Sequence, residues 1–155
     1  MSSEDVLYEK RIDLGSDVVS FVLSCYKIAW VSPWHVRYNP PESFTEKHAQ
    51  KVAKLLMVFG EQIWELLENL EHISIRYRIA IIGTMLLKHY GYGPYTEKRL
   101  MMVCIGFSVL LVFTSIRGYE CLYWKIMRGL YFYIYNPPWY WRSFLDLSSN
   151  SVSTS

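Results

Sequence analysis

Apolar residues recur at helical spacing through one long segment near the middle of the chain. Its apolar positions are Val52, Leu55, Leu56, Phe59, Ile63, Leu66, Leu67 and Leu70. Spacings of three and four residues are typical of an amphipathic helix with one face in a core. Ser43 and Glu46 have the spacing of a capping box, in which the Ser43 hydroxyl accepts a hydrogen bond from the Glu46 amide. The pattern predicts a long helix over residues 43–70.

Beyond this helix the period of the pattern changes to two. Between Ile73 and Ile81, large apolar residues alternate with small or polar ones, among them Arg76 and Arg78. Because successive side chains of a strand point to opposite faces, this alternation would place both arginines on one face of a sheet. The segment is therefore predicted to be a strand.

The stretch from Leu100 to Ile116 contains no charged residue and supports two interpretations. As a helix it is about long enough to cross a bilayer, and Lys98, Arg99 and Arg117 flank it as interfacial cations would. As a strand it is the buried centre of a sheet, because large and small residues alternate from Val103 to Val109. The alternation favours the strand. A small integral membrane protein with a span at 100–116 is the alternative.

Further strands are predicted at residues 17–31, 119–127 and 130–135, where β-branched and aromatic residues are frequent. The order strand, long helix, several strands indicates an α+β fold: an antiparallel sheet with the amphipathic helix packed on one face. A chain of 155 residues is large enough for one core. We expect a single domain over 1–147 and a disordered Ser-rich tail over 148–155.

Charge is divided unevenly along the chain. Residues 1–72 carry seven basic and eleven acidic side chains, whereas residues 73–128 carry eight basic and two acidic ones. Aromatic residues make up 17% of the chain, more than one small core needs. A basic half rich in aromatic side chains could face anionic lipid, nucleic acid or the acidic half of a second copy.

These features predict a basic, aromatic working surface. Its basic members are Arg76, Arg78, Lys98, Arg99, Arg117, Lys125 and Arg128, and its aromatic members are Trp124, Trp139 and Trp141. Cations attract an anionic surface, and tryptophans can insert into it or be buried against a partner. We therefore expect membrane-surface binding or self-association. Binding of single-stranded RNA is a further alternative, disfavoured because Arg76 and Tyr77 would point to opposite faces of a strand.

Catalytic and metal-binding signatures are missing from the sequence. The four histidines are widely spaced, without the clustered ligands of a zinc site. Glu61, Glu65 and Glu68 share a helix face but have no neighbouring nucleophile. We expect no enzymatic activity, cofactor, metal or small-molecule substrate. An odd number of cysteines and an acidic N-terminal segment without an apolar core predict an intracellular, cytoplasmic protein.

Two local motifs suggest a biological setting. Pro137, Pro138 and Tyr140 fit the Pro-Pro-x-Tyr ligand of WW domains, which predicts a WW-domain partner. The passage from the long helix into Ile75–Thr84 resembles rhabdovirus matrix proteins, and the Pro-Pro-x-Tyr is similar to their late-domain motif. The resemblance covers residues 50–90 and implies an α+β, membrane-associated, matrix-like or accessory viral protein, present in the virion or infected cell. That family has a Lys-rich N-terminal arm, whereas this chain begins acidic.

Overall fold

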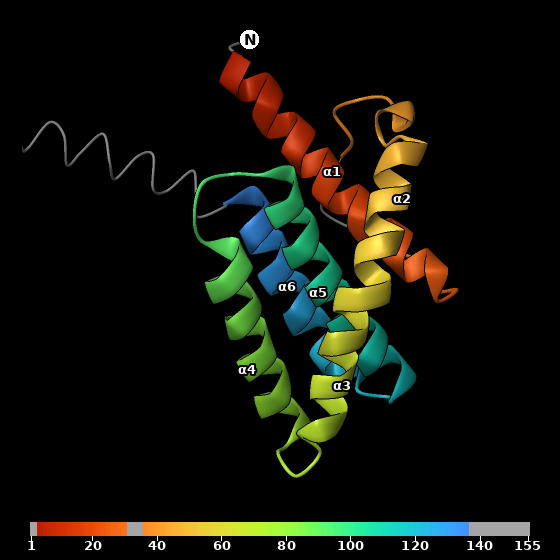
Figure 1. The fold of residues 1–155 in the computed structure, drawn as a ribbon, viewed down its shortest axis with the longest axis vertical. Helices are drawn as coiled ribbons and strands as arrows, with labels where there is room; N and C mark the ends of the chain where they lie inside the picture. Colours follow the sequence, from red (N-terminus) through yellow and green to blue (C-terminus); the bar gives the residue numbers. More distant parts are fainter. Residues whose placement is uncertain (1–2, 31–35, 137–155) are drawn as a thin grey trace, which may run out of the picture.

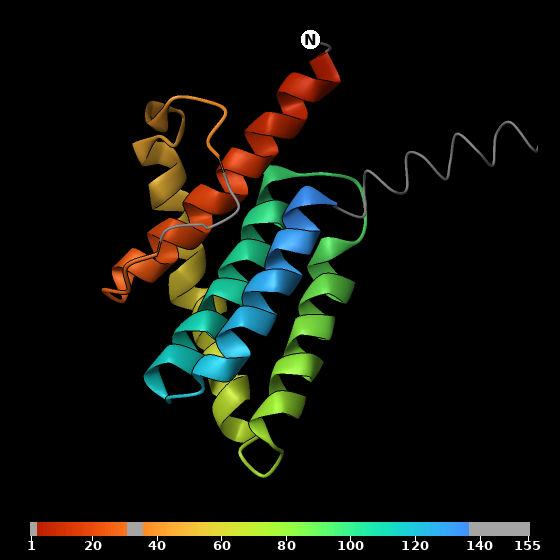
Figure 2. The same cartoon turned by 180° about the vertical axis from the view of Figure 1, so that it is seen from behind.

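The structure is a computed structural model that describes residues 3–30 and 36–136, and its elements are helices (Figure 1). In chain order they are α1 (Ser3–Cys25), the 3-10 turn η1 (Pro41–Ser43), α2 (Glu46–Leu55), the π-helical turn η2 (Leu56–Gly60), α3 (Glu61–Asn69), α4 (Ile75–Leu86), the π-helical turn η3 (Leu87–Gly91), α5 (Glu97–Ile116) and α6 (Glu120–Tyr135). In the views of Figures 1 and 2, α4 and α6 run in the same direction and α5 runs opposite to both.

Helix α5 is the centre of the molecule, and α1, α2, α3, α4 and α6 all contact it. Of its 20 residues, 14 are buried, and they cover every side of the helix. A helix that is apolar all round belongs in a core or in a membrane. By length and composition α5 could cross a membrane, but 83% of its most apolar stretch is buried by other helices of this chain. The predicted strand at 100–116 is wrong, and in the structure this segment is the core helix of a helical bundle.

The predicted α+β class and its antiparallel sheet are also wrong, since no strand occurs among residues 3–30 and 36–136. The segments read as strands form α1, α4 and α6. The alternation between Ile73 and Ile81 was misleading because Ile75 and Ile79 also belong to a helical stripe. That stripe continues with Ile82 and Leu86, at spacings of four, three and four residues. Ile82 and Leu86 are fully buried in that stripe. Strand propensity is a weak preference that burial of a helical face overrides.

The predicted long helix is present as α2, η2 and α3, but its first residues differ from the prediction. Thr45 is the N-cap: its hydroxyl accepts from the His48 amide at 3.3 Å, and the His48 Nδ1 accepts from the Thr45 amide at 3.1 Å. Ser43 does not cap the helix and instead accepts a hydrogen bond from Arg37 at 2.9 Å. The predicted capping box is therefore displaced by two residues.

The π-helical turn η2 interrupts this long helix at its middle. It places Met57 and Val58 in solvent and buries Phe59 and Gly60 against the core. A π turn closes its hydrogen bonds over five residues and is therefore wider than an α turn. The two helical segments on either side of η2 can thus present their apolar residues to different neighbours, α1 and α5 for α2, and α4 and α5 for α3.

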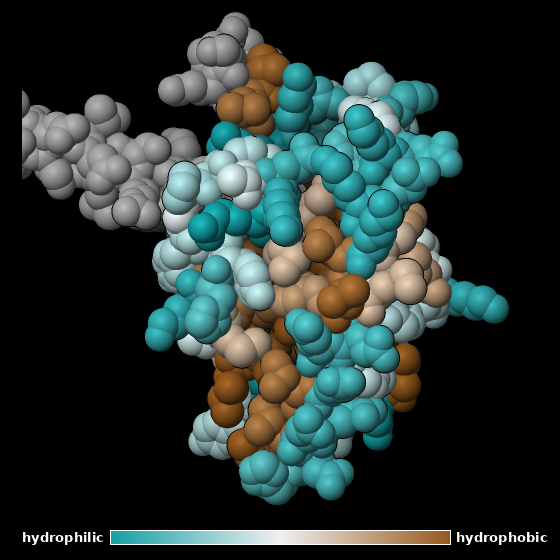
Figure 3. Space-filling model, in the orientation of Figure 1, coloured by the Kyte–Doolittle hydropathy of each residue, from teal (hydrophilic) through white to brown (hydrophobic). Residues whose placement is uncertain are grey.

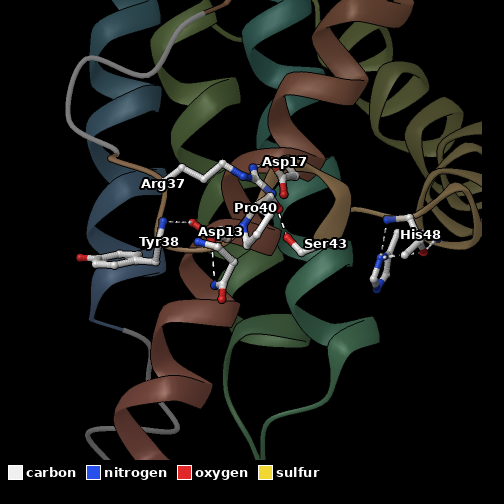
Figure 4. Close-up of polar contacts among 9 residues, drawn as sticks. Asp13, Asp17, Arg37, Tyr38, Pro40, Ser43 and His48 are labelled. Carbon is white, nitrogen blue, oxygen red and sulfur yellow. Dashed lines mark hydrogen bonds and ion pairs between the residues drawn. The ribbon is translucent and has the colours of Figure 1, made fainter. Parts of the chain in front are cut away.

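The loop that precedes α2 is tied to α1 by two aspartates (Figure 4). Asp13 is only 2% exposed and accepts hydrogen bonds from the Tyr38 amide at 3.1 Å and from the backbone and side-chain nitrogens of Asn39, both at 2.7 Å. Asp17 pairs with Arg37. A buried carboxylate needs such donors, because an unsatisfied charge in the interior is costly. These bonds close the α1 side of the bundle.

Candidate functional site

Helices α4 and α6 both pack against α5, and a groove of about 330 Å³ lies between them. In Figure 2, α6 is drawn between α5 and α4, and α4 runs alongside it. The α4–α5–α6 groove is lined by Arg76, Ile79, Ala80, Gly83, Thr84 and Leu87, by Phe107 of α5, and by Leu122, Lys125, Ile126 and Gly129. Most of this lining is apolar, as is typical of binding clefts.

Two glycines face the groove and leave its centre open. A Cβ atom at Gly83 would lie 3.8 Å from the Phe107 ring, and one at Gly129 would lie 3.9 Å from it. Both are ordinary contact distances, so neither glycine is needed to let two helices approach. Glycine within a helix costs about 0.5–1 kcal/mol relative to alanine. Here the missing side chains keep space above Phe107.

The charge of the groove is of one sign and is placed toward one end. Arg76 and Lys125 are its only charged lining residues, and both are exposed. Arg76 lies in the first turn of α4 and Lys125 in the second turn of α6. Because the two helices run in the same direction, these cations lie toward the end where both begin, and the lining at the other end, Thr84 and Leu87, is uncharged.

Exposed apolar side chains are also present on the outer surfaces of both helices. Tyr77 (68% exposed) and Ile81 lie on α4, and Trp124 and Phe132 (64% exposed) lie on α6. Figure 3 shows apolar surface over α4 in the front view. Together with Arg76, Lys88, Lys125 and Arg128, these four residues and the groove form what we name the α4–α6 face. Neither α4 nor η3 contains an acidic residue, and α6 contains only Glu120.

Four of the predicted basic surface residues lie elsewhere. Arg78 donates to the Ile73 and Leu67 carbonyls at 3.0 and 2.9 Å, and so ties α4 to the end of α3. At the start of α5, Arg99 donates to the Tyr92 carbonyl at 2.7 Å, and Lys98 beside it is exposed.

Arg117, at the other end of α5, lies 3.4 Å from a Glu68 carboxylate oxygen and 5.2 Å from the centre of the Phe113 ring. Nineteen residues of helix separate Lys98 from Arg117, roughly 28 Å along the axis. The seven predicted cations therefore do not form one surface: Arg76, Lys125 and Arg128 belong to the α4–α6 face, and the other four do not.

Of the predicted aromatic surface, Trp124 is exposed on α6. The remaining members and the WW-ligand motif lie outside the described residues: Trp139, Trp141, Pro137, Pro138 and Tyr140. The predicted tail at 148–155 lies outside them as well. These assignments stay predictions.

Cys104 and His48 serve the fold. Burial raises the pKa of the Cys104 thiol well above its ordinary value, so this cysteine stays a neutral core residue. His48 belongs to the cap of α2 and lies 3.4 Å from Glu97. Within residues 3–30 and 36–136, no three histidine, cysteine or acidic side chains gather in a way that could hold a metal ion.

Two further cavities are larger than the groove. One, of about 390 Å³ between α1 and the start of α5, is lined by charges of both signs, including Lys10, Asp17 and Glu97. The other, of about 510 Å³, lies near Met57 and Ile116. The sequence interpretation missed the α4–α5–α6 groove because it placed residues 73–81 in a sheet. The helical spacing of Arg76, Ala80, Gly83 and Leu87 was the signal that could have revealed it.

Comparisons of this chain with protein-family models, with curated proteins and with solved structures find no match. The resemblance to rhabdovirus matrix proteins therefore stays a prediction. The residues that carry it, Ile75–Thr84, lie in helix α4, so the α+β fold that the resemblance implies is wrong for this chain.

Proposed function

We propose that this chain is a non-enzymatic interaction protein that attaches to an anionic membrane surface through the α4–α6 face. One observation carries the proposal: cations and large exposed apolar side chains share this face, and Glu120 is the only acidic residue on its helices. Peripheral membrane proteins combine these two properties, because apolar side chains enter the boundary between headgroups and acyl chains while cations attract anionic headgroups.

The same charges argue against self-association through this face. Two copies that met here would bring together two faces of the same charge, because Glu120 is the only acidic residue on the helices of each face. Like charges in an interface are costly and raise the energy of a wrong pairing. Binding to an anionic membrane surface brings opposite charges together and therefore has no such penalty.

The structure gives reasons to prefer peripheral attachment over the two alternatives predicted from the sequence, RNA binding and a membrane span. The RNA-binding hypothesis relied on a sheet that stacks bases, and the described residues contain no sheet. A membrane span at 100–116 would leave little of α5 for lipid contact, because 83% of its most apolar stretch is buried by other helices of this chain. Peripheral attachment uses the surface that the bundle already exposes.

Vesicle co-sedimentation tests the proposal with two matched triple variants. R76Q/K125Q/R128Q removes three positive charges from the α4–α6 face, and K47Q/K51Q/K54Q removes three from α2. Each cation near an anionic bilayer contributes about 1 kcal/mol. We expect the first variant to bind phosphatidylserine-containing vesicles roughly 100-fold more weakly than the unmodified chain, and the second to lose much less.

Equal binding by the two triple variants would show that net charge, not this face, directs the protein. Binding to neutral phosphatidylcholine vesicles at the same strength would overturn the electrostatic part. An alkaline carbonate wash should release the protein from membranes, and retention would favour the integral alternative. Salt-sensitive binding to single-stranded RNA without vesicle binding would replace the membrane proposal with a nucleic-acid one.

A further inference from the structure

We propose that the α4–α5–α6 groove binds one acyl chain of an anionic phospholipid, with the lipid phosphate held at Arg76 and Lys125. This inference rests on the proposed membrane attachment and names the ligand of the same face. The proposed lipid site has three requirements. The groove must have room for an acyl chain, it must have cations toward one end, and its shape and charge must suit a lipid better than a protein segment.

The groove has the size and lining for an apolar chain. Its volume of about 330 Å³ falls in the range of small-ligand clefts, about 300–1,000 Å³. Phe107 forms its floor, and Leu122 and Ile126 line the α6 side. Because Gly83 and Gly129 carry no side chain, the space above Phe107 remains open. Each methylene that enters such a site gains about 0.8 kcal/mol by leaving water.

The two cations make one end of the groove positively charged and leave the other end uncharged. Arg76 and Lys125 lie toward the end where α4 and α6 begin, and the lining from there to Leu87 is uncharged. An anionic amphiphile has the same asymmetry, with charge at one end and an apolar chain behind it. A guanidinium binds phosphate oxygens in a bidentate manner, and an ammonium adds a point charge.

A partner helix fits the groove less well. A helix with its side chains is about 10–12 Å across and contacts a groove over several turns. Such a helix with acidic flanks would contact cations along its whole length, whereas Lys88 and Arg128 lie outside the groove lining and the cations within it lie toward one end. The lipid chain is therefore the occupant that the shape and charge favour.

Isothermal titration calorimetry with monomeric lysophosphatidic acid tests the proposal. Lysophosphatidylcholine of the same chain length keeps the chain but cancels the net negative charge, and glycerol 3-phosphate keeps the phosphate without the chain. We expect lysophosphatidic acid to bind at least about tenfold more tightly than either control compound. Equal binding of glycerol 3-phosphate would overturn the role of the acyl chain, and equal binding of lysophosphatidylcholine would overturn the role of the cations.

Two pairs of variants locate the site. G129L fills the groove without changing charge, and C121L adds the same side chain at an exposed position of α6 outside the groove. R76Q/K125Q removes the cations of the groove, and K88Q/R128Q removes two cations outside its lining, one from η3 and one from α6. We expect G129L and R76Q/K125Q each to weaken lysophosphatidic acid binding about tenfold or more, while C121L and K88Q/R128Q change it less than threefold.

The outcomes separate this inference from the proposed function. G129L should still bind anionic vesicles, because its surface charges are intact. If G129L does not fold, the double variant G83A/G129A fills the groove with smaller side chains and replaces it in the experiment. Normal lysophosphatidic acid binding by the groove-filling variant that folds would overturn the groove site and leave membrane attachment standing. An acidic amphipathic peptide that binds in a G129L-sensitive way, without lipid binding, would make the groove a protein interface and overturn the lipid assignment. Absent vesicle binding by the unmodified chain would reject the proposed function.

Discussion

Packing around glycines differs between the α1 side and the α4–α6 side of the central helix α5. On the α1 side, a Cβ atom at Gly15 would lie 3.2 Å from Ile134, and Asp13 fastens the neighbouring loop with three hydrogen bonds. On the α4–α6 side, Gly83 and Gly129 meet nothing closer than the Phe107 ring at 3.8 and 3.9 Å. Glycine thus allows close packing at Gly15 and leaves space beside Phe107 at Gly83 and Gly129.

The largest expected contrast between the two sides is in cysteine reactivity. Cys104 is fully buried on the α1 side, 3.5 Å from the position of a Cβ at Gly15, whereas Cys25 and Cys121 are exposed. A maleimide should label Cys25 and Cys121 rapidly and Cys104 at least roughly 1,000-fold more slowly, because Cys104 becomes accessible only when the bundle opens.

The raised pKa of the Cys104 thiol keeps it protonated even in mildly alkaline buffer, which slows its reaction further. Mass spectrometry of labelled peptides over time measures the three rates separately. The same experiment in denaturant should label all three cysteines at similar rates. Rapid native labelling of Cys104 would show that the α1 side is not closed.

The next largest effect concerns Asp13. We expect Asp13→Ala to lower the free energy of unfolding by about 3 kcal/mol, because it leaves the Tyr38 and Asn39 donors without the carboxylate that they bind. Asp17→Ala is the matched control on the same helix. It removes a more exposed ion pair with Arg37 and should cost about 1 kcal/mol or less.

Urea denaturation followed by circular dichroism measures both values. Equal losses in the two aspartate variants would mean that the burial of Asp13 makes it no more important for stability than the partly exposed Asp17–Arg37 pair. The closed side would then depend on apolar packing alone.

The smallest expected effects have opposite signs at two glycines. A Cβ at Gly106 would lie 2.6 Å from a terminal carbon of the fully buried Leu86, so Gly106→Ala should destabilise the protein by about 1–2 kcal/mol. Gly129→Ala makes only an ordinary contact with Phe107 and gains helix propensity. It should therefore stabilise the protein by about 0.5–1 kcal/mol.

Thermal unfolding of the two alanine variants measures the difference in sign. If both substitutions destabilise the protein, the groove is less open than the structure indicates. If Gly129→Ala stabilises the fold and also weakens lysophosphatidic acid binding, the glycine keeps the groove open at a cost in stability.

The sequence pattern predicts one long helix of this fold correctly but does not predict α4, α5 and α6 as helices. The helix over 43–70 could be predicted because its charged and apolar faces are separated along its length. Helix α5 could not, because a segment buried on every side has no polar face to reveal its period. In α4 and α6, isoleucines and aromatic residues favour strands locally, and only packing against α5 selects the helix.

The candidate site shows the same limit. Arg76, Lys125, Arg128 and Trp124 were predicted surface residues and lie on the α4–α6 face, but the groove depends on which helices are neighbours. No local pattern brings Gly83, Phe107 and Gly129 together. Nor could the sequence show that Arg78 would bind the end of α3, because its partners are backbone carbonyls rather than acidic side chains.

The π-helical turn η2 has a consequence for the evolutionary history of the chain. Five residues there span a turn that four would span in an α-helix, which is equivalent to the insertion of one residue. Relatives could lack one residue between positions 56 and 60 and still direct Val52 and Ile63 toward the core. A one-residue deletion elsewhere in this helix would rotate everything beyond it by about 100°. In a family alignment, η2 is therefore where a single-residue gap inside a helix would be tolerated.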